Sequence, residues 1–246
     1  MNQDGVTIDS YFNKVFIKNL KKNVNRKELM IKKLEKAKIT NYEFVTAING
    51  YEQPYYNHYL TFRIRNQYFE NAGTYGLLMT VLKILVWSKI KNYKKILIME
   101  DDAIFHKSII SEFNKKIKNI PDWKLLYFGT SLHEWRFSER VKIDNSKGIM
   151  RSSGSIPGAF SVGIDSSVFN ELINSIYVTN MPWDLGPLRN INIKYHPQVL
   201  IFYPYLAICE TEDSNLREGC DEVFQLVSEI LTVSTKEMKG SHETEF

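Results

Sequence analysis

Three consecutive acidic residues, Glu100, Asp101 and Asp102, directly follow an uninterrupted apolar run at 96–99. Side chains alternate along an extended chain, so Glu100 and Asp102 are expected to project to the same side. Two converging carboxylates need a cation nearby, because like charges at close range are costly. An all-oxygen ligand set suits Mg²⁺ or Mn²⁺. The triplet therefore predicts a divalent metal site with Asp102 and Glu100 as ligands, and the alternative is that the acids only cap a following helix.

A metal ion at this point would suit a reaction in which a nucleotide diphosphate leaves. The ion would neutralise the negative charge that develops on the leaving group. Sugar transfer from a nucleotide sugar has this electrostatic requirement. A phosphatase-type aspartyl nucleophile is a rival reading, but Ala103-Ile104-Phe105 lacks the Thr expected two residues after that aspartate.

The elements that must position the triplet alternate between strands and helices. Apolar runs predict strands at 15–17, 42–47, 95–99, 123–128, 158–164 and 198–203. Amphipathic spacing predicts helices from about 25 to 37, at 73–89, at 108–120 and at 168–176. This order indicates an α/β fold with a mostly parallel central sheet flanked by helices. Ligands bind such sheets beyond the carboxyl ends of the strands, where the triplet stands.

Local signals refine two helix starts and one connection. Asn25 and Glu28 have the spacing of a capping box. Ser166 or Ser167 is expected to cap the helix at 168–176. Residues 51–70 are rich in Tyr, Asn and Gln without a clear period, so they are interpreted as a loop near the active site.

Length and composition favour one folded domain. The chain has 246 residues, of which 43% are apolar, enough for one sizeable core. We expect a single domain over 1–234 and a disordered polar tail at 235–246. The two cysteines, Cys209 and Cys220, form no zinc-binding pattern.

The charge distribution limits the partners. A net charge of +4 does not indicate a nucleic-acid partner. Lysines are concentrated between 14 and 38, which is typical of a solvated helix face. The alternative is a basic surface that contacts an anionic acceptor or a membrane peripherally. Residues 1–10 do not read as a signal peptide, and no apolar run is long enough to span a bilayer, so we expect a cytoplasmic protein.

Several segments together resemble glycosyltransferase family 25, which includes lipooligosaccharide and collagen-hydroxylysine galactosyltransferases. The similar segments follow the family's order from about residue 14 to 220. They are Val15-Phe16-Ile17-Lys18-Asn19-Leu20 with Arg26, Phe44-Val45-Thr46-Ala47-Ile48-Asn49-Gly50, Gly73-Thr74-Tyr75-Gly76, Ile96-Leu97-Ile98-Met99-Glu100-Asp101-Asp102, Gly158-Ala159-Phe160, Pro182-Trp183-Asp184 and Pro204-Tyr205-Leu206-Ala207. Each segment alone is weak, but their order and spacing make the set specific.

The resemblance implies a GT-A fold and an inverting transfer of a hexose, galactose or glucose, from a UDP-sugar with Mn²⁺ or Mg²⁺. It implies acceptor hydroxyls on a glycan, a lipooligosaccharide or a hydroxylated protein. The donor would contact residues at the strand ends and the helix start, which are Asn19, Leu20, Arg26, Ala47, Gly50, Gly73, Gly76, Glu100 and Asp101. One departure is that Thr80-Val81 stands where the family has Ser-His, which leaves the donor sugar open.

An inverting transfer needs a general base for the acceptor hydroxyl. Asp184, between Trp183 and Leu185, is the predicted base, and the alternative is an ordinary loop acid. Glu210 and Asp213 are candidates for a third metal ligand or for a contact with the acceptor. Aromatic candidates for stacking on a sugar are Trp135, Trp183 and Tyr205, although such residues more often belong to a core.

Two other functions remain open at this point. The first is a binding module for nucleotide sugars or carbohydrates that keeps the fold without the chemistry, which the Thr80-Val81 departure favours. The second is a nucleotidyltransferase, which would release pyrophosphate where a glycosyltransferase releases UDP.

Overall fold

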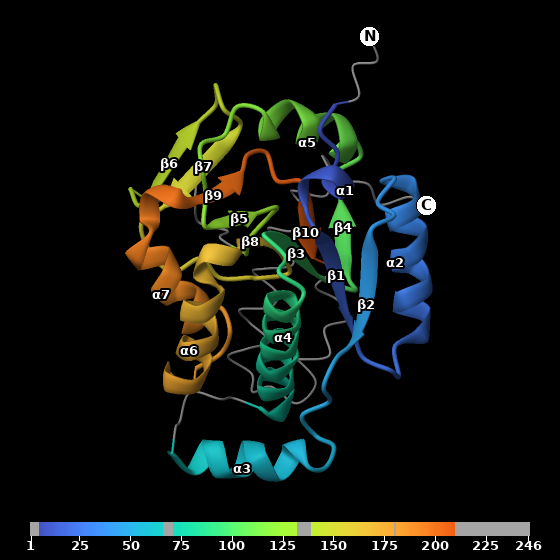
Figure 1. The fold of residues 1–246 in the computed structure, drawn as a ribbon, viewed down its shortest axis with the longest axis vertical. Coiled ribbons are helices and arrows are strands. Elements are labelled where there is room, and N and C mark those ends of the chain that lie inside the picture. The colour runs from blue at the N-terminus through green and yellow to red at the C-terminus, as the bar shows by residue number, and fades with distance from the viewer. Residues whose placement is uncertain (1–4, 66–70, 132–138, 180, 210–246) are drawn as a thin grey trace.

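The computed structural model describes residues 5–65, 71–131, 139–179 and 181–209 (Figure 1). The strands are β1 (Lys14–Asn19), β2 (Tyr42–Thr46), β3 (Lys95–Glu100), β4 (Ala103–Phe105), β5 (Leu125–Tyr127), β6 (Val141–Asp144), β7 (Ile149–Ser152), β8 (Ser161–Asp165), β9 (Val199–Phe202) and β10 (Ala207–Cys209). The helices are α1 (Ile8–Tyr11), α2 (Val24–Lys36), α3 (Tyr55–Arg65), α4 (Ala72–Ile90), α5 (Ile109–Ile117), α6 (Phe169–Thr179) and α7 (Pro187–Lys194), with short 3₁₀ helices η2 (Ser166–Val168) and η3 (His196–Gln198).

An eight-stranded sheet in the order β2-β1-β3-β8-β5-β9-β7-β6 forms the centre of the described residues. β1 is parallel to β2 and β3, and β5 is parallel to β9. β8 runs antiparallel to β3 and β5, and β7 runs antiparallel to β9 and β6. Six of these eight strands therefore point the same way, which confirms the mostly parallel sheet. The carboxyl ends of β1, β2 and β3 meet at one edge.

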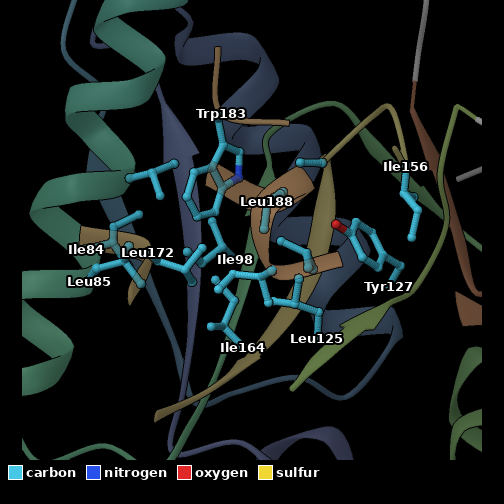
Figure 2. Packing of buried hydrophobic residues seen from close by; sticks show 14 of the residues in the cluster. Ile84, Leu85, Ile98, Leu125, Tyr127, Ile156, Ile164, Leu172, Trp183 and Leu188 are labelled. Atoms are coloured by element: carbon cyan, nitrogen blue, oxygen red, sulfur yellow. The ribbon is translucent and has the colours of Figure 1, made fainter. Parts of the chain in front are cut away.

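Alternate residues of the central strands face two separate cores. Val15 and Ile17 pack with side chains of α1, α2 and α5 on one face of the sheet. Phe16 and Ile98 pack with α4, α6 and α7 on the other face, and Figure 2 shows Ile98 among side chains of these helices. Because both faces are covered, β3 is apolar without interruption. The flanking helices expected from the sequence are confirmed.

The chain continues from the acidic triplet into a strand and not into a helix. β4 begins at Ala103 and pairs antiparallel with β10, with Ile104 opposite Ile208. The next helix, α5, starts at Ile109. The alternative that the triplet caps a following helix is therefore wrong.

Both predicted helix caps are also wrong. α2 begins at Val24, so Asn25 lies inside its first turn and Asn23 is the N-cap residue. The Asn19 side chain donates to the Asn23 carbonyl oxygen at 3.1 Å and thereby fixes the start of α2 close to the end of β1. Before the helix predicted at 168–176, the Asp165 side chain accepts from the Ser167 backbone N–H. An aspartate and not a serine therefore caps η2, which precedes α6.

The segment predicted to be a loop at 51–70 contains a helix, α3, which lies across the end of α4 (Figure 1). Tyr59 is buried, and the Phe62 ring lies 5.3 Å from the Tyr75 ring of α4. Tertiary packing of aromatic side chains stabilises this helix, since its residues show no helical period of their own. The loop prediction was therefore wrong for Tyr55–Arg65 and correct for 51–54, which form turns, while 66–70 lie outside the described residues.

The β6–β7 hairpin and the β4–β10 pair were not predicted at all. None of the helices in the described ranges has the length and apolarity that a bilayer-spanning segment needs. The polar tail expected at 235–246 lies outside the described residues and stays a prediction.

Candidate active site

A cavity of about 340 Å³ lies beyond the carboxyl ends of β1, β2 and β3. Its walls come from the three strand ends, from the first turns of α2 and α4, and from the acidic triplet. The lining residues are Lys18, Leu20, Lys22, Asn23, Arg26, Ala47, Ile48, Asn49, Gly50, Tyr51, Gly73, Leu77, Glu100, Asp101 and Asp102. The cavity therefore stands where ligands bind open α/β sheets.

Glu100 is paired with a buried lysine on the neighbouring strand. Lys18 of β1 lies opposite Glu100 of β3 in the parallel register. The Lys18 Nζ atom is 3.1 Å from Glu100 Oε1, and only 4% of Lys18 is exposed. A buried ammonium group needs such a partner, because an isolated charge away from water is costly. The pair fixes one carboxylate of the triplet at the cavity wall.

Arg26, in the first turns of α2, contacts the other two carboxylates. Its Nη2 atom lies 2.7 Å from Asp102 Oδ2 and also bonds Asp101 Oδ1. The strand ends at Glu100, and a turn at Asp101 and Asp102 aims both side chains at Arg26. The alternation assumed for an extended chain therefore stops at Glu100, and all three acids line one cavity.

Asp101 is bound by the Asn19 side chain as well as by Arg26. Its Oδ2 atom accepts from the Asn19 side chain at 2.6 Å, and Asn19 also donates to the Asn23 carbonyl oxygen. Burial raises the pKa of Asp101, while Arg26 and the Asn19 hydrogen bond oppose the rise. Asp101 and Asn19 together tie the β1–α2 connection to the end of β3. Asn19 itself does not line the cavity.

Asp102 carries negative charge that is only partly balanced. Burial and the neighbouring Glu100 raise the pKa of Asp102 to about 7, although Arg26 opposes the rise. Its Oδ1 atom is buried and has no hydrogen-bond partner among the described residues. A buried carboxylate oxygen without a hydrogen-bond partner is costly unless a cation or a hydrogen-bond donor binds it. Asp102 and Glu100 therefore fit a divalent ion that takes its remaining ligands from water and phosphate.

Within the described ranges, no three His, Cys, Asp or Glu side chains are arranged to hold a metal ion by themselves. This is compatible with Mg²⁺ or Mn²⁺, which are commonly bound through one or two carboxylates together with substrate phosphates. The third ligand predicted from Glu210 or Asp213 lies outside the described residues.

The loop after β2 is packed tightly against α4. A Cβ atom on Gly50 would stand 1.6 Å from the Ala72 carbonyl oxygen, and one on Gly76 would stand 2.3 Å from the Ile48 carbonyl oxygen. The Thr80 hydroxyl group accepts from the Ile48 backbone N–H at 2.8 Å and donates to the Gly76 carbonyl oxygen. The glycines thus allow close contact between loop and helix, and Gly76 does not line the cavity.

The departure at Thr80-Val81 has a structural explanation in this chain. Thr80 holds the loop after β2, and Val81 is fully buried in the core shared by α4 and the sheet. Neither residue lines the cavity.

Asp184 lies near the same edge of the sheet but outside this cavity. Its Oδ2 atom accepts from the Gly158 backbone N–H at 3.2 Å. Two residues further on, the Phe160 carbonyl oxygen accepts from the Glu100 backbone N–H at 2.8 Å. The short segment 158–160 therefore connects Asp184 to the triplet.

The aromatic candidates for sugar stacking belong to the core where they are described. Trp183 is 1% exposed (Figure 2), and Tyr205 is 4% exposed with its hydroxyl group 2.8 Å from the Thr130 hydroxyl group. Burial raises the pKa of Tyr205 to about 12. The third candidate, Trp135, lies outside the described residues.

Sequence reasoning found Leu20, Arg26, Ala47, Gly50 and Gly73 in the cavity wall, together with the triplet. It missed others, among which the charged and polar ones are Lys18, Lys22, Asn23, Asn49 and Tyr51. The signal for Lys18 was present, since a lysine near the end of an otherwise buried strand is unusual without a partner.

A sequence model described as Glycosyltransferase family 25 (LPS biosynthesis protein) matches residues 12–184. No curated protein matches the chain. The matched segment is more than half of the 246 residues, and it contains the whole cavity wall and Asp184. The chain therefore belongs to glycosyltransferase family 25.

Proposed function

We propose that this glycosyltransferase transfers a hexose, galactose or glucose, from a UDP-sugar to a hydroxyl group with inversion at the anomeric carbon. The observation that carries the proposal is the combination of three carboxylates with Lys18, Lys22 and Arg26 around one cavity of about 340 Å³. A diphosphate needs cationic partners, and a divalent ion needs the acids. The acceptor would be a glycan, a lipooligosaccharide or a hydroxylated protein.

The cavity walls suggest how the donor is held. Leu20, Ala47 and Gly50 would contact the uridine end, and Gly73 would stand near the phosphates at the start of α4, where anions are favoured. Asp102 and Glu100 would hold Mn²⁺ or Mg²⁺. When bound, the ion supplies neutralisation of the charge on the leaving diphosphate.

Asp184 is proposed as the base that takes the acceptor proton. Support comes from its connection to the triplet through 158–160 and from its position outside the donor cavity. A base for the acceptor must lie beside the donor site and not within it, because the incoming hydroxyl group attacks from the face opposite the leaving diphosphate in an inverting transfer. The carboxylate would hold the acceptor hydroxyl and receive its proton.

The proposal is tested by incubating the protein with a panel of nucleotide sugars and Mn²⁺ and measuring the released nucleotide. We expect UDP release from UDP-galactose or UDP-glucose. Because slow hydrolysis of the donor also releases UDP, the assay needs no knowledge of the acceptor. Release of pyrophosphate would indicate a nucleotidyltransferase. Binding of UDP without release from any sugar, over a panel of acceptors, would indicate a binding module.

A further inference from the structure

The two carboxylates that suit a divalent ion, Asp102 and Glu100, are also the ones that bind the two cations of the cavity. Arg26 Nη2 is 2.7 Å from Asp102 Oδ2, and Lys18 Nζ is 3.1 Å from Glu100 Oε1. A divalent ion on Asp102 and Glu100 would place further positive charge within contact of Arg26 and Lys18. Like charges at this range repel strongly where water is scarce. The ion and these two side chains therefore compete for the same two carboxylates.

Charge balance in the cavity also penalises a diphosphate that binds by itself. Three carboxylates face Arg26 and Lys18, so the paired groups carry an excess of one negative charge. A diphosphate adds more negative charge beside these acids. The charges of a divalent ion and a diphosphate that enter together would compensate each other. The ion would displace Arg26 and Lys18, which the diphosphate needs, and the diphosphate would draw these cations away from the carboxylates that the ion needs.

Both cations already face the cavity in which the diphosphate would bind. Arg26 and Lys18 line the same cavity as the triplet, on the first turns of α2 and at the end of β1. Guanidinium and ammonium groups bind phosphate oxygens at least as well as they bind carboxylate oxygens. Asp101 keeps its hydrogen bond from Asn19 if Arg26 leaves, so the β1–α2 connection stays in place.

We propose that Lys18 and Arg26 are exchangeable counter-ions, which neutralise the acidic triplet and move to the donor diphosphate when a divalent ion takes their carboxylates. The exchange makes the ion and the nucleotide bind cooperatively. This inference rests on the proposed function and adds to it the expectation that the protein holds an ion tightly only together with its donor.

The test is a direct measurement of Mn²⁺ binding by electron paramagnetic resonance of the free ion, with and without saturating UDP and corrected for Mn²⁺–UDP association in solution. For the unaltered protein, we expect UDP to tighten Mn²⁺ binding by about tenfold or more, within the usual range of coupling between sites. In Arg26→Gln, Mn²⁺ alone should bind severalfold more tightly, and the coupling should fall to about threefold or less. Lys18→Gln should act in the same direction.

The matched control is Lys22→Gln, which removes a positive charge from the same cavity wall. Among the described residues, Lys22 forms no ion pair with the triplet, so its loss should weaken UDP binding and leave the coupling close to that of the unaltered protein. Arg26→Lys keeps the charge, and circular dichroism shows whether each variant is folded.

Independent binding of Mn²⁺ and UDP to the unaltered protein would overturn the inference, whatever the variants do. So would weaker binding of Mn²⁺ alone to folded Arg26→Gln. These results are separable from a failure of the proposed function, because Mn²⁺ and UDP can bind cooperatively to a protein that transfers no sugar. Conversely, UDP release from a UDP-sugar without cooperative binding would preserve the function and reject the exchange.

Discussion

Asp101 and Asp102 are neighbours in the chain, but the protein uses them differently. Asp101 is held by Asn19 as well as by Arg26, and so connects β3 to the start of α2. Asp102 is bonded by Arg26 on one oxygen, and its other oxygen has no hydrogen-bond partner in the described part of the chain. One acid therefore positions the site, and the other is available to a ligand.

Truncation of the two aspartates should consequently affect stability in opposite ways. Asp101→Ala leaves the Asn19 amide with one bond fewer and should lower the free energy of unfolding by about 1–3 kcal/mol. The pKa of Asp102 is raised to about 7 in the folded protein from 3.8, so above pH 4 the unfolded chain ionises first and rising pH lowers stability. At pH 8 without divalent ions, Asp102→Ala should unfold at the same urea concentration as the parent or a higher one. A large destabilisation by Asp102→Ala would contradict this.

Asp184 should matter for the transfer step and not for donor binding. Asp184→Asn keeps an oxygen that accepts from the Gly158 N–H but cannot take up a proton at neutral pH. We expect kcat to fall by about 10²–10⁴, the usual contribution of a general base, while the Kd for UDP with Mn²⁺ stays unchanged. The measurement is sugar transfer to acceptor alongside calorimetric UDP binding. Normal kcat in this variant would assign the base to another residue.

At the level of residues, the triplet could be predicted because its type and its position after an apolar strand point to the same chemistry. For Lys18, the sequence signals only that a buried lysine needs a partner. It does not identify that partner, because Glu100 is 82 positions away and lies opposite Lys18 only once β1 pairs with β3. Arg26 was placed in the site by family resemblance, and its contact with both aspartates appears only in three dimensions.

Among the elements, the contact between the β2 loop and α4 shapes the donor cavity. Gly50 and Gly76 allow the loop and the helix to approach, and Thr80 bonds the Ile48 N–H. The sequence predicted α4 correctly in outline. The family resemblance assigned Gly50 to donor contact, whereas the nearest obstacle to a side chain there is the Ala72 carbonyl oxygen of the protein itself.

Gly76→Ala should therefore separate the loop from the helix. Its Cβ atom would stand 2.3 Å from the Ile48 carbonyl oxygen, which is backbone and cannot rotate away. We expect the free energy of unfolding to fall by about 1–3 kcal/mol, as for other overpacked sites, and UDP binding to weaken. In the control Gly154→Ala, the nearest atom is the flexible tip of Arg140 at 3.3 Å, so stability should change little. Equal urea midpoints for the two variants would show that the contact is not close.

The strands and helices with strong periodicity were the ones that the sequence predicted. In β1, β3 and α4, most of the positions that become buried are apolar. α3 was interpreted as a loop because its residues have no helical period, and aromatic residues such as Tyr59 and Phe62 pack against Tyr75 of α4 only in the folded protein. The β6–β7 hairpin was missed because its exposed strand, β6, has no continuous apolar run.

For the whole molecule, the sequence established that strands and helices alternate but not how the strands are ordered. β8 is inserted antiparallel between β3 and β5, and this places the segment 158–160 beside the triplet. Such an order depends on pairings between distant segments, which local periodicity does not encode. The resemblance to family 25 supplied the GT-A fold in its place, and the α/β sheet with flanking helices agrees with it.

The central claim is that the acidic triplet binds a metal ion for glycosyl transfer. The most direct measurement is UDP release from the preferred UDP-sugar by the parent protein and by Asp102→Ala, with Mn²⁺ and after its removal by a chelator. We predict release that requires Mn²⁺ and falls by about a hundredfold or more in folded Asp102→Ala, as when other preorganised charge stabilisation is lost. Undiminished release by Asp102→Ala, or by the parent protein without any divalent ion, would contradict the claim.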